Sequence, residues 1–366
     1  MKKESLSVLS VLVIMAMLAA CAPAATVAPA ATVAPAATVA PAATVAPAAT
    51  VAPTAKPEKQ LVIASVVKGI SYNWFQRLET GIKQFGIDNN VKTFMEGPSQ
   101  VDSAAQVGII EDLIAQGVDG ICNVPYGVPE NEPATKKAMD AGIVVVGHEA
   151  ATAKGGTMNY SVEAFDNKSY GEEMMKEMAT RMGGKGKYIQ FVGSLTNASH
   201  NEWTDAAKAY QEKNYPDMKF AGKFDSKEDA EVSYNTLKDL LKTNPDIKGV
   251  QGSSGNDVVG AGRAVEEAGL ADSTTVIGTS IPSMTSKLLT TGAVDLIMAW
   301  DPALAGYACN KVIYKIIKGE PITDGMDLGV PGFEKIKLIT GVNGLPVIYG
   351  SAWLKMDAKN MDQYKF

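Results

Sequence analysis

This chain of 366 residues has only two histidines, and both stand where a side chain could do chemistry. His148 follows the apolar run Val144–Gly147 and precedes Glu149, and His200 lies between Ser199 and Asn201. A histidine at such a place is a buried structural side chain, a general base or a contact for a bound molecule. We favour ligand contact, because both histidines follow predicted strands. Glu149 could orient His148, contact the ligand or lie in solvent.

Catalytic and cofactor motifs do not support an enzyme. His148–Glu149 and His200–Glu202 are conceivable acid–base pairs, but neither pair is specific. The sequence has no Gly-x-Ser-x-Gly elbow, no Gly-x-Gly-x-x-Gly or P-loop, and no zinc-ligand spacing. We therefore expect no catalytic residues, no cofactor and no metal. The formal net charge of −6 argues against a nucleic-acid partner.

Other polar and aromatic residues also follow predicted strands, where ligands bind in doubly wound sheets. These strand-end candidates are Lys68, Ser71, Tyr72, Asn73, Trp74, Tyr126, Ser199, Asn201, Trp203, Ser253, Ser254, Asn256, Thr279, Ser280, Trp300 and Asp301. They include three of the four tryptophans. Indole faces suit the C–H faces of a sugar, and convergent donors and acceptors suit its hydroxyls. The set predicts a pocket for a small hydroxylated molecule.

Several of these candidates have a plain structural alternative. Lys68 could be an ordinary surface lysine, although it stands between the first strand and an aromatic run. Trp74 and Trp300 are the strongest candidates, but either could pack one lobe on the other. Asp301 precedes Pro302, so it could cap a helix or accept a ligand hydroxyl, and we favour the acceptor.

The elements that must position these residues alternate between apolar strands and amphipathic helices. Strands are predicted at 61–67, 91–97, 120–124 and 143–147, with helices at 74–88, 102–116 and 132–141 between them. The pattern restarts at 187–193 and continues to a strand at 294–300. The predicted fold class is α/β, with two doubly wound Rossmann-like lobes joined by a multi-strand hinge.

The lobes are expected to exchange segments. We place 60–163 and about 298–340 in the N-terminal lobe, and 164–297 and about 341–366 in the C-terminal lobe. Cys122 and Cys309 lie in apolar contexts, where buried free thiols are favoured over a disulfide.

The N-terminal part has the pattern of an exported, anchored protein. Residues 1–20 predict a signal peptide, with Lys2 and Lys3 before an apolar stretch. Leu18–Cys21 looks like a bacterial lipobox, which makes Cys21 a lipidation site; the alternative is an ordinary signal with a chance cysteine. Residues 21–59 repeat "VAPAAT" and predict an extended Ala/Pro/Thr tether.

Three longer segments add a family resemblance. LVIASVVKGISYNWFQRLETGIKQ, GPSQVDSAAQVGIIEDLIAQGVDGI and LIMAWDPALAGY resemble the type I periplasmic sugar-binding proteins of ABC importers. Within that family they are most similar to the branch with the autoinducer-2 and rhamnose-binding proteins. The resemblance covers nearly all of residues 60–366. It implies two Rossmann-like lobes, three hinge strands and a ligand enclosed by closure.

The resemblance also implies site residues at matching positions. These are Lys68, Tyr72, Trp74, Phe75, His148, Glu149, Ser199, His200, Asn201, Ser254, Ser280, Trp300 and Asp301. Autoinducer-2 binders carry carboxylates where this chain has His148 and Ser199, and ribose-type binders use Asp near His148 and Ser280. The hydroxyl-binding pattern therefore differs from both, and it favours a small neutral polyol, pentose or deoxy-sugar.

The functional hypothesis is an extracytoplasmic, lipid-anchored receptor that passes a small neutral sugar or polyol to an ABC permease and its ATPase. We expect a monomer held at the membrane by its lipid anchor. The alternatives are a sensory co-receptor for an autoinducer-2-like or sugar signal and, more remotely, a cell-surface hydrolase.

Overall fold

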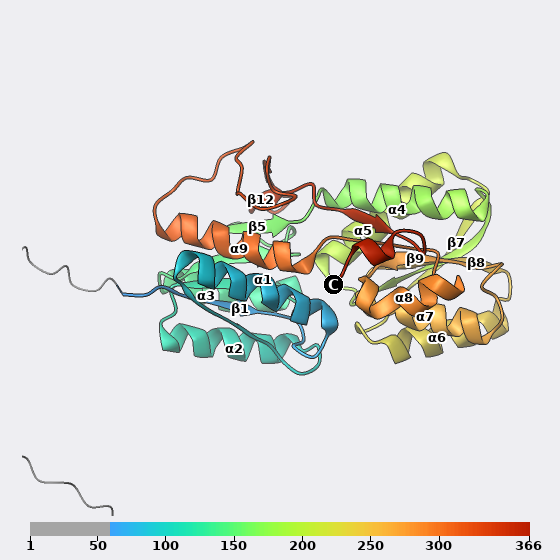
Figure 1. Ribbon diagram of the computed structural model, residues 1–366, viewed down its shortest axis with the longest axis horizontal. Coiled ribbons are helices and arrows are strands. Elements are labelled where there is room, and N and C mark those ends of the chain that lie inside the picture. The colour runs from blue at the N-terminus through green and yellow to red at the C-terminus, as the bar shows by residue number, and fades with distance from the viewer. Residues whose placement is uncertain (1–58) are drawn as a thin grey trace, which may run out of the picture. The chain divides into compact units, whose positions relative to one another are not determined.

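The computed structural model describes residues 59–366, which are coloured in Figure 1. The predicted signal peptide, the lipidation site Cys21 and almost all of the predicted tether lie outside the described residues. Residues 59–366 lie within one compact unit. Within the described part of the chain, no helix is long and apolar enough to cross a bilayer.

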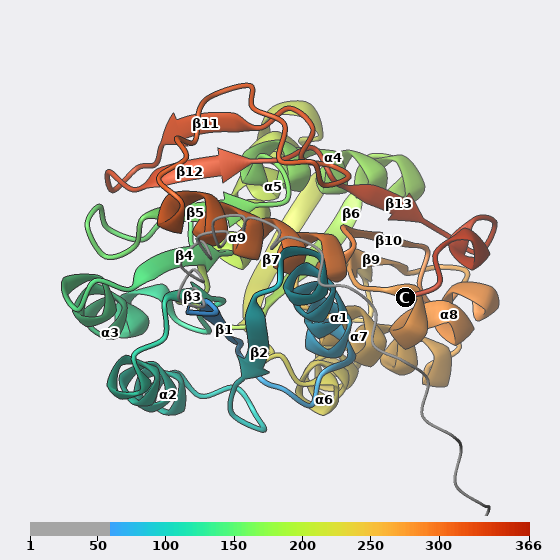
Figure 2. The ribbon, with the colours of Figure 1, turned by 60° about the vertical axis from the view of Figure 1, so that its left-hand side comes forward.

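The described residues form two sheets. The first has the strand order β11-β12-β5-β4-β3-β1-β2, which can be followed in Figure 2. Its strands are β1 (Val62–Val66), β2 (Lys92–Glu96), β3 (Gly120–Asn123), β4 (Val144–His148), β5 (Tyr160–Glu163), β11 (Lys337–Thr340) and β12 (Pro346–Tyr349). All neighbours run parallel except β11 and β12.

Helices cover both faces of this sheet, because alternate residues of its strands are apolar on both faces. On β1, Ile63 points into the core beneath α1 (Asn73–Asn89) and α9 (Pro302–Ile317), whereas Ala64 belongs to the opposite core. That second core lies beneath α2 (Ser103–Gln116) and α3 (Val128–Asp140). A parallel sheet buried on both faces requires this arrangement. We call this layer the N-terminal lobe.

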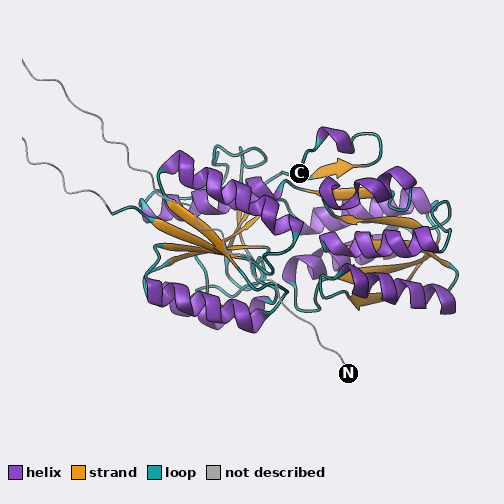
Figure 3. Cartoon of the chain, turned by 60° about the horizontal axis from the view of Figure 1, so that its bottom comes forward, coloured by secondary structure: helices purple, strands orange, loops and turns teal. Residues whose placement is uncertain are grey.

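The second sheet has the order β13-β10-β9-β8-β6-β7 and forms the C-terminal lobe. Its strands are β6 (Gly186–Val192), β7 (Met218–Asp225), β8 (Ile247–Gly252), β9 (Thr275–Thr279), β10 (Leu296–Ala299) and β13 (Leu354–Met356). Its helices are α4 (Asn167–Met182), α5 (Ala198–Asn214), α6 (Ala230–Thr243), α7 (Gly255–Glu267) and α8 (Pro282–Thr291), and the short 3₁₀ helix η1 (Met361–Gln363) contacts α8. Helices α4 and α5 pack on one face, and α6 and α7 on the other. Figure 3 shows helices on both sides of the strands.

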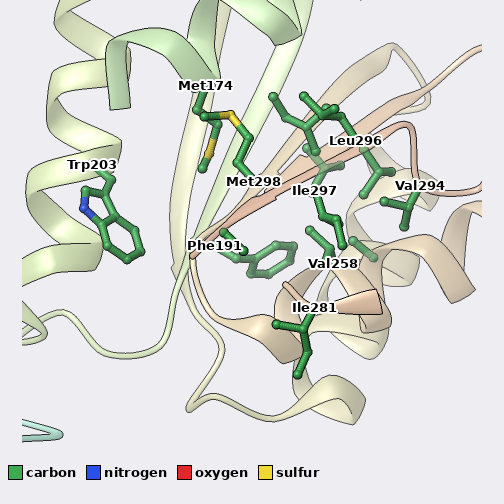
Figure 4. Packing of buried hydrophobic residues seen from close by; sticks show 14 of the residues in the cluster. Met174, Phe191, Trp203, Val258, Ile281, Val294, Leu296, Ile297 and Met298 are labelled. Atoms are coloured by element: carbon green, nitrogen blue, oxygen red, sulfur yellow. The ribbon is translucent and has the colours of Figure 1, made fainter. Parts of the chain in front are cut away.

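The core of the C-terminal lobe combines residues from both helix layers. Figure 4 shows Met174 of α4, Val258 of α7, and Ile297 and Met298 of β10, all fully buried. Successive residues of β10 point to opposite faces of the sheet, so this short strand serves both layers.

Helix pairs approach closely in both lobes because a glycine lies at each contact. A Cβ atom on Gly81 of α1 would lie 1.8 Å from the backbone oxygen of Ala303 in α9. A Cβ atom on Gly171 of α4 would lie 2.1 Å from the backbone oxygen of Trp203 in α5. Any larger side chain would push these helices apart, and α5 carries residues of the candidate site.

The chain passes between the lobes at three places. The first and third crossings run side by side, because Gly350 and Ala352 donate backbone hydrogen bonds to Glu163 and Ala164, both at 2.9 Å. The third crossing lies between β12 and β13, about ten residues after the predicted position near 340. The prediction missed β12, which pairs with β5 in the first sheet, so residues 341–349 belong to the N-terminal lobe.

Two smaller expectations can also be compared with the structure. Cys122 of β3 and Cys309 of α9 are buried free thiols, as expected. Helix α3 begins at Val128, four residues before the predicted start at 132. A proline at the start of α3 fits the first turn of a helix, where its missing N–H costs no hydrogen bond.

Candidate functional site

A cavity lies between the carboxyl ends of the strands of the two sheets. Its walls are Lys68, Tyr72, Trp74, Phe75, Glu149, His200, Trp203, Glu228, Ser253, Ser254, Gly255, Asn256, Thr279, Met284 and Trp300. The first five belong to the N-terminal lobe, and Trp300 lies at the crossing between β10 and α9. The cavity volume is about 30 Å³, so the side chains fill most of the space between the lobes.

Lys68 links the two lobes inside this cavity. Its ammonium donates to Glu149 Oε2 at 2.6 Å in its own lobe and to Glu228 Oε1 at 3.1 Å in the other. All three side chains are buried. Glu149 follows β4 and Glu228 follows β7, and both have left-handed backbones, with φ of 57° and 52°. Such conformations cost on the order of 1–3 kcal/mol in non-glycine residues and concentrate at functional sites.

The two carboxylates differ in their response to burial. Burial alone would lower the pKa of Lys68, but Glu149 and Glu228 outweigh it and hold that pKa above its ordinary value. Burial would raise the pKa of Glu149, but the nearby Lys68 ammonium holds it below its usual value. At Glu228 burial prevails, and the pKa is raised even though Lys68 opposes the shift. Glu149 has the shorter contact to Lys68, and Glu149 itself contributes to raising the pKa of Glu228.

The two histidines are neutral and carry their protons on opposite nitrogens. Burial lowers the pKa of His148, and burial together with Lys68 lowers that of His200 to about 3. His148 Nδ1 lies 2.7 Å from the Val162 carbonyl oxygen, so Nδ1 carries the proton and Nε2 is an acceptor. His200 Nδ1 accepts from the Gly193 amide at 3.0 Å, so its Nε2 is a donor.

Trp300 is the centre of an aromatic group around the cavity. Its ring lies edge-on to Trp74, with centroids 4.8 Å apart, and to Trp203 at 5.9 Å. The Trp203 indole N–H donates to Asn167 Oδ1 at 2.8 Å. The Trp300 N–H is buried and has no hydrogen-bond partner among the described residues. An unpaired buried donor costs ~1–3 kcal/mol, so this N–H is poised for an acceptor.

Hydroxyl and amide groups line the C-terminal side of the cavity. The buried Ser253 Oγ has no partner among the described residues. Ser254 caps α7 in a capping box with Asp257, and Asn256 donates from Nδ2 to the Glu228 carbonyl at 2.7 Å. Thr279 Oγ1 lies 3.0 Å from the Tyr170 hydroxyl.

Of the thirteen positions implied by the resemblance together with Tyr126, eight line the cavity: Lys68, Tyr72, Trp74, Phe75, Glu149, His200, Ser254 and Trp300. Six do not line it: Tyr126, His148, Ser199, Asn201, Ser280 and Asp301. His148 is set one layer back, with its ring edge-on to Trp300 at 5.7 Å and its Nε2 buried without a partner. Its expected place on the cavity wall is therefore not observed.

The remaining exceptions have local structural roles. Asp301 caps α9 by accepting from the Ala303 amide at 2.9 Å and forms a two-point ion pair with Arg77 at 2.8 and 2.6 Å. The cap that the sequence left as the alternative is thus what the structure has. Tyr126 donates across the lobes to the Gly193 carbonyl at 3.1 Å.

The last three lie on or beside helix starts. Ser280 Oγ donates to the Gly255 carbonyl at 2.9 Å. Ser199 and Asn201 lie in the first turn of α5, which begins at Ala198. Asn201 Nδ2 donates to the carbonyls of Ser194 and Asn197, and Ser199 Oγ is buried without a partner.

The cavity also contains residues outside these fourteen positions. Trp203, Ser253, Asn256 and Thr279 were strand-end candidates in the sequence, whereas Glu228, Gly255 and Met284 were not. Glu228 follows β7, so the strand-end rule would have found it. Its charged surroundings, Asp225-Ser-Lys-Glu-Asp229, resemble an exposed loop instead. Among residues 59–366 no group of three or more His, Cys, Asp or Glu side chains could hold a metal ion.

Comparisons with known proteins agree on one family. The family model described as "Periplasmic binding protein domain" matches residues 63–321. The D-ribose/D-allose-binding protein of Pseudomonas aeruginosa is 26% identical over 241 residues, which are 61% of this chain and 71% of that protein. The xylitol-binding protein of Mycolicibacterium smegmatis is 27% identical over 193 residues, 52% of this chain and 53% of its own length.

The fold matches solved structures closely. An ABC transporter solute-binding protein from Clostridium phytofermentas, solved with bound L-rhamnose, superposes with a TM-score of 0.77. The alignment covers 83% of this chain and 98% of that one, at 19% identity. The predicted fold class and the resemblance to sugar-binding proteins of ABC importers are both confirmed.

Proposed function

Because this chain belongs to the periplasmic binding protein domain family, we propose that it is an extracytoplasmic solute receptor for a small neutral sugar or polyol. The observation that carries the proposal is the interlobe cavity, where three indoles surround hydroxyl and amide groups, two carboxyl groups and one buried lysine. The receptor delivers its ligand to an ABC permease and is not an enzyme.

The hydrogen-bonding groups of the cavity suit hydroxyls. Trp300 Nε1 and His200 Nε2 are donors, and the Glu149 and Glu228 carboxylates are acceptors. The Ser253 hydroxyl can do either. A hydroxyl both donates and accepts, so a polyol satisfies such a mixed set, and the indole faces cover its C–H groups.

The cavity is too small for a sugar, so the proposed function requires the lobes to open and close. A space of about 30 Å³ holds little more than water, so a sugar enters only when the lobes separate or side chains shift. Lys68–Glu228 and Tyr126–Gly193 are the polar contacts that re-form on closure. Hinge closure around a ligand is a common device in bilobed receptors.

The location and partners of the receptor rest on the sequence. The signal pattern and Cys21 support a lipid anchor on the outer side of the membrane, and the repeats after it would separate the receptor from the bilayer. The relatives named for D-ribose/D-allose and xylitol support a sugar or polyol ligand. We expect the receptor to work as a monomer with a permease and its ATPase.

Thermal unfolding of residues 59–366 in a panel of sugars and polyols tests the proposal. A ligand at 100 times its Kd stabilises by ~2.7 kcal/mol and shifts the midpoint measurably. Trp300→Phe keeps a ring but removes the indole N–H, so it should weaken the response to the same compound. Trp353→Phe is the control, because Trp353 does not line the cavity. A complete panel without a stabilising compound would contradict the proposal.

A further inference from the structure

The charged groups of the cavity do not balance. Among the described residues that line it, one ammonium group, that of Lys68, contacts two carboxyl groups, those of Glu149 and Glu228. His200 adds no charge, because burial and the nearby Lys68 lower its pKa to about 3. Glu149 alone would neutralise Lys68 at 2.6 Å, so Glu228, at 3.1 Å, supplies an excess negative charge when it is ionised, and burial raises its pKa.

The surroundings of Glu228 do not offset this charge. Asp257 is a further buried acid that Glu228 acts on electrostatically, with Oδ2 accepting from the amides of Ser253 and Ser254. The carboxylate of Glu228 also faces Tyr72, whose pKa is raised first by burial and then by Glu228. In a dry cavity a second anion beside these groups meets repulsion that solvent does not screen.

The backbone holds the Glu228 carboxylate in the cavity. Lys227 and Glu228 both have positive φ, 55° and 52°. The Glu228 amide donates to Ser226 Oγ at 3.2 Å, and its carbonyl accepts from Asn256 Nδ2 at 2.7 Å. Glu149, on the other lobe, has the same type of backbone. The two carboxylates are therefore fixed on opposite sides of Lys68 and do not swing freely to solvent.

We propose that Glu228 is a specificity-determining residue: when ionised, it gives the closed cavity one negative charge in excess, and it thereby excludes sugar acids and phosphorylated sugars while admitting uncharged and amino-substituted ones. This inference rests on the proposed function as a sugar or polyol receptor. A simpler role, in which Glu228 only accepts a ligand hydroxyl, would affect neutral and acidic ligands equally.

A matched ligand panel separates these two roles. Xylitol, D-ribose, L-rhamnose and D-glucose are each compared with the corresponding aldonate, and D-glucosamine serves as the amine. The readout is the ratio of the Kd of each acid to the Kd of its neutral parent, measured by calorimetry. We expect the acids to bind at least about 100-fold more weakly to the unchanged protein.

Three variants carry the same change of overall charge. In Glu228→Gln the ratio should fall at least tenfold, and in Glu149→Gln it should fall in the same direction, because both remove a charge from one cavity. Glu212→Gln is the control on an exposed stretch of α5, where the side chain pairs with Lys208. An unchanged ratio in Glu228→Gln overturns the proposal, as does a ratio that moves in Glu212→Gln by the same factor.

A measurement without sugar keeps this inference separate from the proposed function. In a Trp353→Phe background the remaining indoles, Trp74, Trp203 and Trp300, all line the cavity. The ratio of iodide to acrylamide quenching of their fluorescence should rise in Glu228→Gln at constant ionic strength and stay constant in Glu212→Gln. If no compound of the panel binds, the receptor proposal fails. The quenching ratio alone then tests whether Glu228 keeps anions out of the cavity. A quenching ratio that does not rise in Glu228→Gln overturns the proposal for Glu228.

Discussion

The two lobes meet the cavity with different chemistry. The N-terminal lobe contributes Lys68, Glu149 and an aromatic group, whereas the C-terminal lobe contributes Glu228, His200 and Trp203 with a row of hydroxyl and amide groups. The first lobe offers flat apolar faces around a single cation, and the second offers small polar groups. Lys68 lies between the two carboxyl groups, one from each lobe, so the contact between the lobes and the lining of the cavity use the same residues.

Backbone strain is concentrated at the contact between the two lobes. Of the four described non-glycine residues with positive φ, Glu149 and Glu228 are the two that contact Lys68. Each follows a strand of a different lobe, and each directs its carboxylate to the same ammonium. Each lobe therefore holds its carboxyl group beside Lys68 with a strained backbone conformation.

The largest expected effect comes from removing the shared cation. Lys68→Met leaves two buried carboxylates without a partner, which costs about 3–5 kcal/mol of unfolding free energy at pH 7. The loss should shrink at lower pH, as the carboxylates become protonated, and ligand binding should be abolished. Urea unfolding at pH 5 and 7 measures it, with the exposed Lys242→Met as control. Equal stability of the two variants at pH 7 would contradict the account.

An intermediate effect is expected at the crossing between the lobes. Burial raises the pKa of Glu163 to about 8 from 4.5, with smaller contributions from Glu202 and Glu149. Its Oε1 accepts from Ser161 Oγ at 2.7 Å and from the Ala150 amide at 3.0 Å. The folded state therefore binds this proton more tightly, so its contribution to stability is full below pH 4.5 and is lost as the pH rises through 8.

Glu163→Gln removes that contribution and should flatten the pH profile. Between pH 5 and 8 the unchanged protein should lose up to about 1.4 kcal/mol per pH unit more than the variant. Chemical unfolding at a series of pH values measures the difference. Parallel profiles for the two proteins would show that the proton is not held more tightly in the folded state.

The smallest effect is expected for Asp301, and it tests whether this residue contacts the ligand. Asp301→Asn keeps a side chain that can cap α9 but loses the ion pair with Arg77, which is about one-third exposed, at 32%. We expect a loss of about 0.5–1 kcal/mol of stability and an unchanged ligand Kd. A weakened Kd without a change in stability would return Asp301 to the ligand contacts.

Much of the fold was accessible from the sequence because its strands and helices follow simple periods. Helix α2, for example, was predicted at 102–116, and the structure has it at Ser103–Gln116 with Asp102 as its cap. Gly117 ends it in the left-handed conformation that glycine favours. The β11–β12 pair was missed because two strands of four residues give little periodic signal.

The sequence predicted only part of the cavity lining, because it does not show in which direction each side chain points. The strand-end rule brought Lys68, Trp74 and Trp300 to one cavity, but it does not say which of several consecutive residues faces inward. Asp301, next to Trp300, turns to the backbone of α9 and to Arg77. Glu228 was missed because only tertiary packing buries a carboxylate from so charged a segment.

A crystal structure of residues 59–366 with the sugar or polyol that stabilises them most would examine the central claim directly. We predict that the molecule lies between the two sheets, with hydroxyls on Glu149, Glu228 and the Trp300 N–H and a C–H face against the indoles. Density for the molecule anywhere else, with these side chains unchanged, would contradict the account.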